Sequence, residues 1–240
     1  TVAAILIESV VGTAGVLVPP PGYLAGVRAL CDKYGIVYIA DEVMSGFGRT
    51  GAWFAFDHFD VEPDLIIFAK GSNSGYVPLG GIIISDEIAA TFDDRVFPGG
   101  LTYSGHPLAT ASALATLTAM QAEGIVEHAA TIGRDVLGPG LAELADKHKV
   151  IGEVRGMAVF WALELVSDRA TREPLAPYGG SSEAMAVLTA GCTSRGLLPF
   201  TNFNRLHVVP PCVVTESEAR EGLAILDQAL TEIDRFYLGD

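Results

Sequence analysis

The chain has 240 residues and a net charge of −14, from 15 basic and 29 acidic residues, and half of its residues are hydrophobic. This length allows one large domain, or a large domain with a smaller one. A charged fraction of only 18% argues against disorder. The acidic balance argues against nucleic acid as a partner, because phosphate binding needs a basic face. No apolar run is long enough to predict a membrane-spanning helix.

The three cysteines, Cys31, Cys192 and Cys212, are far apart in the sequence. Their spacing predicts neither a disulfide framework nor a metal site, and it favours a reducing, cytoplasmic location. The chain enters an apolar run directly after Thr1. We interpret this start as that of a fragment whose N-terminal portion is missing.

Four apolar runs divide the first 85 residues, and helical or loop sequence separates them. The runs cover 2–7, 36–40, 64–69 and 81–85. A helix is predicted over 23–34, because its apolar residues recur at helical spacing and a glycine follows. Runs that are apolar on both faces and alternate with helices are typical of a parallel sheet covered on both sides, as in doubly wound α/β domains.

The later sequence predicts helices and short strands in close succession. Helices are predicted over 106–121, 125–148, 183–195 and 216–236, a strand-like segment over 157–166, and short strands near 197–200 and 206–209. This pattern indicates a smaller α+β domain. We therefore predict that residues 1–123 form part of a large domain with a connector helix. Residues 124–240 are expected to form a connecting helix and a small C-terminal domain.

Two ionisable residues directly follow apolar runs. Asp41 follows IVYIA and Lys70 follows DLIIFA. Ligands of open parallel sheets bind at the carboxyl ends of the strands, so both side chains are expected to face one crevice. Partial burial there favours a neutral lysine amine, which forms Schiff bases with carbonyls, and an opposing carboxylate can keep a pyridine nitrogen protonated. The pair therefore suggests pyridoxal phosphate (PLP).

Two other interpretations of these residues stay open. Lys70 can be an ordinary strand-end lysine that reaches into solvent. The apolar run before Asp41-Glu42 also resembles the acidic strand of a nucleotide hydrolase. That class of enzyme needs a GxxxxGK[ST] loop, which this sequence does not contain.

Four motifs, in order, resemble the class III (omega-type) PLP-dependent aminotransferases. They are DEVMSGFGRTG at 41–51, FAKG at 68–71, YVPLGG at 76–81 and TYSGHP at 102–107. The resemblance extends through most of the chain and corresponds to the C-terminal portion of the family. It implies the aspartate-aminotransferase type of fold (PLP fold type I), with a mostly parallel sheet in the large domain and a small α+β domain.

The resemblance also implies roles for individual residues. Lys70 would form the Schiff base with PLP and move the substrate proton, and Asp41 would pair with the pyridine nitrogen. Val43 would pack against the ring, and Thr102 would bind the cofactor phosphate of the other subunit in a homodimer. The structural alternatives are that Val43 is a core residue and Thr102 a turn hydroxyl.

The family's N-terminal half supplies the rest of the PLP site, including a phosphate-binding loop and a stacking aromatic residue. A chain of 240 residues alone is therefore expected to bind PLP weakly and to turn over poorly.

Departures from the family pattern bear on the substrate. The ornithine and GABA types of the family carry an acidic residue and an arginine where this chain has Thr13 and His207, and the ω-amine:pyruvate type carries an arginine where it has Phe200. A buried substrate carboxylate needs a charged partner, and a guanidinium is the best one. We expect Arg205, aided by His207, to bind the acid group. The alternative is that Arg205 points to solvent at a strand edge.

The function predicted is that of a PLP-dependent transaminase. It would move an amino group from an amine or ω-amino acid, taurine-like donors included, to pyruvate or 2-oxoglutarate by a ping-pong mechanism. Two alternatives remain. One is an aminomutase or decarboxylase on the same scaffold, and the other is a non-catalytic fragment that offers a dimerisation or binding surface.

Overall fold

The computed structural model describes residues 1–240, which divide into two compact units. The first unit contains Thr1–Val10 and Pro19–Val126, and the second contains Val11–Val18 and Glu127–Asp240. The chain therefore enters the second unit twice. Its first passage is the short segment Val11–Val18, which we call the strap, and its second follows Val126.

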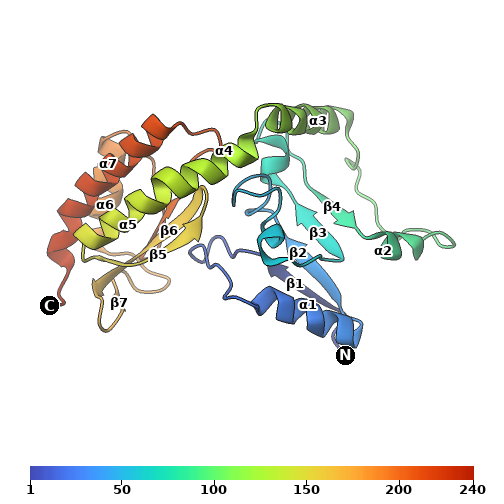
Figure 1. The fold of residues 1–240 in the computed structure, drawn as a ribbon, viewed down its shortest axis with the longest axis horizontal. Helices are drawn as coiled ribbons and strands as arrows, with labels where there is room; N and C mark the ends of the chain where they lie inside the picture. The colour runs from blue at the N-terminus through green and yellow to red at the C-terminus, as the bar shows by residue number, and fades with distance from the viewer. The chain divides into compact units, whose positions relative to one another are not determined.

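The sheet of the first unit has the strand order β1-β2-β3-β4 (Figure 1). Its strands are β1 (Ala4–Glu8), β2 (Val37–Asp41), β3 (Leu65–Phe68) and β4 (Gly81–Ile84). The first three strands run parallel, and β4 runs antiparallel to β3. The prediction of a mostly parallel sheet is confirmed. The direction changes at β4 because no crossover helix separates it from β3.

The helices of the first unit are mostly short. They are α1 (Tyr23–Tyr34), η1 (Ala55–Phe59), η2 (Lys70–Asn73), α2 (Asp86–Ala90) and α3 (Pro107–Ala122). The predicted bounds of α1 are confirmed, since Gly35 ends it in the left-handed conformation at φ 63°. Leu24 and Cys31 of α1 pack against Tyr38 and Ala40 of β2, which covers one face of the sheet.

The other face of this sheet is only partly covered. Leu6 of β1 is 57% exposed and Ile82 of β4 is 59% exposed. The sequence led us to expect burial on both faces, because these strands are apolar on both sides. Within this chain that expectation is wrong for β4, whose last three residues are all exposed.

The sheet of the second unit is antiparallel, with the order β5-β6-β9-β8 and β7 paired to β6. Its strands are β5 (Ile151–Met157), β6 (Phe160–Asp168), β7 (Glu173–Pro174), β8 (Phe200–Asn202) and β9 (Arg205–Val208). The strand-like segment predicted over 157–166 corresponds to β6, but β5 was not predicted and the predicted segment starts too early, because the chain reverses at Ala158 with φ 49°. The two turn residues, Ala158 and Val159, are not types that predict a turn, such as glycine, asparagine or proline.

Helices cover this second sheet. They are α4 (Ile125–Ile132), η3 (Gly133–Leu137), α5 (Gly138–Lys147), α6 (Glu183–Ser194), α7 (Glu216–Ile233) and η4 (Asp234–Phe236). The first three form one continuous helical stretch, which the sequence predicts as a single helix. None of the helices combines the length and the apolar character needed to cross a membrane.

A π-helical turn, η3, interrupts this long helical stretch. Pro139 has no N–H to donate to residue 135, which disfavours regular α-helix there. Gly133 also approaches the β5–β6 hairpin so closely that a Cβ on it would lie 2.1 Å from the Cα of Ala158. The turn therefore accommodates the proline and the close packing together.

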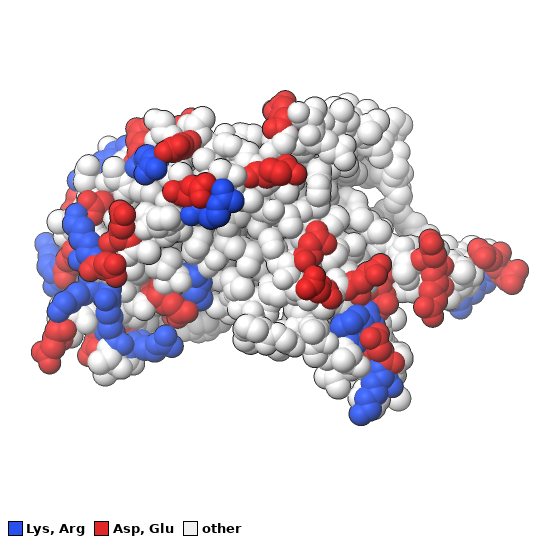
Figure 2. All heavy atoms as spheres, in the orientation of Figure 1, with Lys and Arg blue, Asp and Glu red and all other residues white.

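Polar and charged side chains link the helices of the second unit. His148 is 1% exposed, and its two ring nitrogens each lie 2.7 Å from a carboxylate, of Asp227 and of Asp234. On the face in view, acidic and basic side chains are interspersed over the second unit (Figure 2). Examples are the contacts Lys147–Asp227 and Arg195–Glu232.

Candidate functional site

Asp41 and Lys70 lie at the same edge of the first sheet. Asp41 is the last residue of β2, and its register partner in the parallel neighbour β3 is Ile67. β3 ends at Phe68, and Lys70 opens the turn η2. Asp41 is half-buried, whereas Lys70 is exposed. The partial burial expected for this lysine is not found, because Lys70 lies beyond the last strand residue and outside the packed layer.

The chain turns sharply after Asp41. The backbone N–H of Val43 donates to Oδ1 of Asp41 at 3.0 Å, and Val43 itself is half-buried. A side chain that accepts from the backbone two residues later forms an Asx turn, which orients the carboxylate. The bond occupies Oδ1, so Oδ2 is the oxygen that this turn offers to a ligand.

Glu42 directly follows β2 and is completely buried. Its carboxylate accepts hydrogen bonds from the hydroxyls of Ser9 and Ser45 and from the backbone N–H groups of Ala55 and Phe56. Burial raises the pKa of Glu42, and these four donors act in the opposite direction. Sequence reasoning did not single this residue out. The sequence did offer one signal for a buried acid here, because Glu42 is a second acid directly after the strand.

The turn that carries Lys70 packs against the glycine-rich motif. A Cβ on Gly71 would lie 2.9 Å from the Cβ of Phe47, so the backbone of the turn rests against that side chain. Phe47 in turn makes edge-to-face contacts with Phe54 and Phe68, with ring centroids 5.5 and 5.8 Å apart. These aromatic rings connect the motif at 41–51 to the end of β3.

Thr102 lies in an exposed turn before α3 and makes no hydrogen bond to Asp41 or Lys70. Its neighbours Leu101 and Tyr103 are each 80% exposed. The helix that follows begins at His106, whose Nδ1 accepts the N–H of Leu108. His106 is thus the N-cap of α3.

Arg205 and His207 lie on β9 of the second unit, and both bind the strap. Arg205 donates from Nη1 to the carbonyl of Ala14, and the ring Nε2 of His207 lies 3.3 Å from the carbonyl of Gly12. Two further side chains complete the contact. Asn202 donates from Nδ2 to the carbonyl of Thr13 at 3.0 Å, and Arg155 donates from Nε to the carbonyl of Gly15 at 3.1 Å. Four consecutive carbonyls of the strap are therefore held by side chains of the second unit.

Arg205 therefore does not simply point to solvent. Its Nε also donates to the carbonyl of Asn202, and its guanidinium lies 5.3 Å from the ring centroid of Phe203. Burial lowers the pKa of His207, and the charge of Arg205 acts in the same direction.

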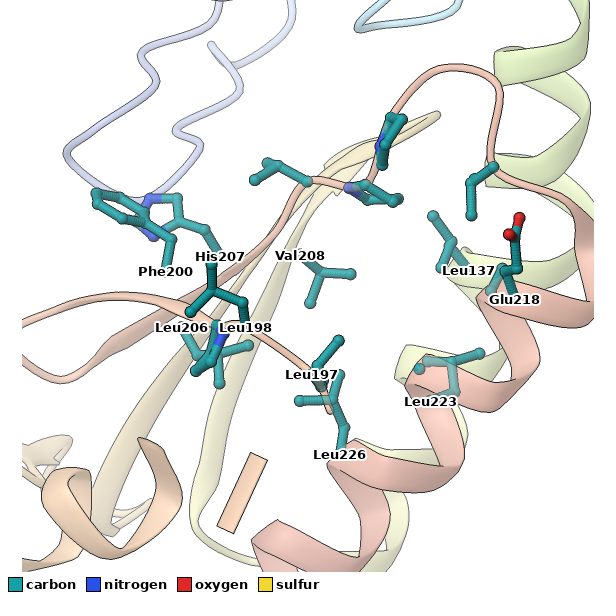
Figure 3. Close-up of a pocket in the computed structure, with 17 residues that line it drawn as sticks. Leu137, Leu197, Leu198, Phe200, Leu206, His207, Val208, Glu218, Leu223 and Leu226 are labelled. Carbon is teal, nitrogen blue, oxygen red and sulfur yellow. The ribbon is translucent and has the colours of Figure 1, made fainter. Parts of the chain in front are cut away.

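His207 also lines an apolar cavity of about 340 Å³ inside the second unit (Figure 3). The imidazole stands beside the ring of Phe200, with centroids 4.9 Å apart. Leucines of the segment after α6 and of α7 form much of the remaining wall, among them Leu197 and Leu223. None of Asp41, Val43, Lys70 and Thr102 lines this cavity.

Comparisons with known proteins give a consistent result. The family described as aminotransferase class-III matches residues 1–230. The taurine–pyruvate aminotransferase of Bilophila wadsworthia is 36% identical over 98% of this chain and 53% of its own length. The putrescine–pyruvate aminotransferase of Pseudomonas aeruginosa is 37% identical over 96% of this chain and 50% of its own length.

A solved structure extends this similarity to the fold. The taurine:2-oxoglutarate aminotransferase of Bifidobacterium kashiwanohense, in complex with PLP and glutamate, is 44% identical. It superposes with a TM-score of 0.93 over 97% of this chain and 52% of its own. The chain thus spans about half the length of the relatives it matches.

Proposed function

Because the chain belongs to the class-III aminotransferase family, we propose that it carries the reactive lysine and the pyridine-binding carboxylate of a PLP-dependent transaminase. The enzyme moves an amino group from an amine or ω-amino acid, such as a taurine-like donor, to a keto acid such as pyruvate or 2-oxoglutarate. The observation that carries the proposal is the position of Lys70 and Asp41 after the carboxyl ends of adjacent parallel strands.

The residues at this edge fit the cofactor. When bound, PLP supplies an electron sink for charge that develops on the substrate carbon. Asp41 keeps one oxygen, Oδ2, for the pyridine N–H while the Val43 amide holds Oδ1. Lys70 would hold the cofactor through Nζ. Once the substrate amine has replaced it there, its exposed amine would be available to accept and return a proton. The half-buried side chain of Val43 would pack against the ring.

For the acid group of the substrate we propose Arg205, with His207 beside it. The bonds from Nε and Nη1 of Arg205 to backbone carbonyls hold its guanidinium in one orientation. A preorganised guanidinium loses little freedom when it binds a carboxylate or sulfonate. Replacement of Arg205 by alanine tests this assignment, which is withdrawn if the apparent affinity for the keto acid does not change.

We also propose a homodimer with shared sites, in which Thr102 binds the cofactor phosphate of the other subunit. The exposure of the segment around Thr102 supports this, because Leu101 and Tyr103 leave large apolar surfaces uncovered. A cytoplasmic location is part of the proposal and is supported by three free cysteines.

The decisive experiment is borohydride reduction of the chain with PLP, followed by peptide mapping. A pyridoxyl group on Lys70 is expected. Its absence from Lys70 in the full-length protein excludes catalysis by this route and favours the non-catalytic alternative. A donor screen that follows the spectrum of the bound cofactor then identifies the amine. With donor but no keto acid, a transaminase stops after one half-reaction, whereas an aminomutase or a decarboxylase continues.

A further inference from the structure

The turn η2, which carries Lys70, is strained at both ends. Lys70 has φ 49° and Ser74 has φ 47°, a left-handed conformation that is unfavourable for residues other than glycine. The backbone hydrogen bonds of the turn are long, 3.3 Å from Ser72 N to Ala69 O and 3.4 Å from Ser74 N to Gly71 O. Such bonds are weaker than those of about 2.9–3.0 Å found in regular structure. The turn therefore needs support from outside.

That support comes from the side chain of Asn73, which belongs to a residue only 1% exposed. Its Nδ2 donates to the carbonyl of Val77 at 2.5 Å and to that of Ala109 at 3.4 Å. Its Oδ1 accepts the hydroxyl of Ser112 at 2.5 Å. One buried amide thus ties the turn to the loop that follows it and to two positions of α3.

The chemistry of these three contacts requires an amide. Two of the partners are carbonyls, which need donors, and the third is a hydroxyl that donates. An aspartate in this place would set a carboxylate against two carbonyl oxygens. On the opposite side of the turn Gly71 meets Phe47, which blocks movement in that direction but forms no hydrogen bond.

We propose that Asn73 is a positioning residue for Lys70: it holds η2 in its strained conformation and thereby fixes the backbone from which the lysine amine projects. The reactive role of Lys70 in this statement rests on the proposed function. The anchoring of the turn does not, because it follows from contacts within the chain.

Hydrogen exchange tests the anchoring without any cofactor. In Asn73→Ala, amides of residues 70–77 and 107–113 are expected to exchange about tenfold faster, the factor that corresponds to roughly 1.4 kcal/mol. The matched control is Asn204→Ala, which removes a buried amide that donates to Leu165 O at 3.0 Å in the second unit. The control should leave exchange at 70–77 unchanged. Unchanged exchange at 70–77 in Asn73→Ala would overturn the proposal.

A milder variant covers the case in which Asn73→Ala does not fold. Ser112→Ala removes one of the three contacts and keeps the amide, so exchange at 70–77 should rise less, by about threefold. Adding Ser112→Ala to Asn73→Ala should produce no further change, because both remove the same bond. Unchanged exchange in Ser112→Ala, or fully additive effects, would contradict the anchor.

Trapping of PLP with borohydride tests the effect on Lys70. At a fixed, subsaturating concentration of PLP, Asn73→Ala should carry about tenfold less pyridoxyl group on Lys70 than the wild type, and Asn204→Ala should match the wild type. If Asn73→Ala carries as much pyridoxyl group on Lys70 as the wild type, the positioning role is refuted. If the wild type itself carries no pyridoxyl group on Lys70, the proposed function fails, and the exchange measurement alone decides whether Asn73 anchors the turn.

Discussion

At the scale of single residues, the adjacent acids Asp41 and Glu42 have different environments. Asp41 ends β2 and is half-buried at the sheet edge, whereas Glu42, the next residue, is completely buried. One carboxylate oxygen of Asp41 is available to a ligand. Both carboxylate oxygens of Glu42 accept hydrogen bonds, from the segment that follows β2 and from Ser9. Glu42 therefore contributes to the site indirectly, by holding the backbone around it in place.

Replacement of Glu42 by glutamine should destabilise the first unit by about 1–3 kcal/mol. Oε2 of Glu42 accepts the N–H of Ala55, and Oε1 accepts the N–H of Phe56. In either orientation the NH₂ group of glutamine would therefore face a backbone N–H, which can only donate. Chemical denaturation of the wild type and of Glu42→Gln measures the difference. Equal free energies of unfolding would show that the buried carboxylate does not organise this segment.

The three thiols should differ in reactivity. Burial raises the pKa of Cys192 to about 11 and also raises the pKa of Cys31, whereas Cys212 is only half-buried. Because the thiolate is the nucleophile, iodoacetamide should label Cys212 first in the native chain. Mass spectrometry of partly labelled protein checks this order, with the denatured chain as the control. Labelling of Cys192 at the rate of Cys212 would contradict the prediction.

At the scale of elements, the strap depends on donors from β5, β8 and β9. Nε2 of His207 faces the carbonyl of Gly12 and donates to it, whereas Nδ1 is buried without a hydrogen-bond partner. A proton added at Nδ1 would be buried near the guanidinium groups of Arg205 and Arg155. We therefore expect the contact between β9 and the strap to weaken in mild acid.

Stability should therefore fall as the pH drops below about 6.5, the ordinary pKa of histidine. Burial lowers the pKa of His207 in the folded chain, so the unfolded chain binds the proton more readily in that window and gains stability from it. Free energies of unfolding at pH 7.5 and 5.0 should show a smaller advantage of the wild type over His207→Asn at the lower pH. An advantage that stays constant would refute this.

The π-helical turn gives a second prediction at this scale. Gly133→Ala places a Cβ against the backbone of Ala158 and should destabilise the second unit by about 3 kcal/mol. The control is Gly222→Ala in α7, where the nearest atom would be 4.0 Å away. It should stabilise the chain by about 0.5–1 kcal/mol through helix propensity. Thermal unfolding of the two variants compares them, and shifts of the same sign would contradict the prediction.

At the scale of the whole molecule, the chain covers about half of each relative it matches. Exposed apolar residues on β1, β4 and around Thr102 indicate surfaces that are incompletely covered in this chain, such as Leu6, Ile82 and Tyr103. The family resemblance assigns further PLP contacts to sequence that this chain does not span.

We accordingly expect the 240-residue chain to bind PLP about 100-fold more weakly than a relative of full length, which corresponds to the loss of a few hydrogen bonds. Absorbance titration of both proteins measures the difference. A dissociation constant equal to that of the relative would show that the residues of this chain suffice for the site.

Much of the fold could be predicted from the sequence, because its signals are local. Helix α1 has amphipathic spacing and a terminal glycine, and the parallel strands are continuous apolar runs. The motifs likewise indicated Asp41 and Lys70, since both follow such runs. The β5–β6 reversal was missed because Ala158 adopts a left-handed turn without a turn residue, and the burial of Glu42 and Asn73 was missed because it depends on distant partners.

The sequence by itself determined the family, the parallel strands and longer helices, and the residue types that chemistry with PLP needs. Only the tertiary structure decided that Arg205 and His207 bind the strap, that Glu42 is buried behind Asp41, and that Asn73 holds the turn of Lys70. The physical reason is the separation along the chain over which each effect acts. Periodicity and turn preference act over a few neighbouring residues, whereas these hydrogen bonds join side chains to backbone groups that are brought close only when the chain folds.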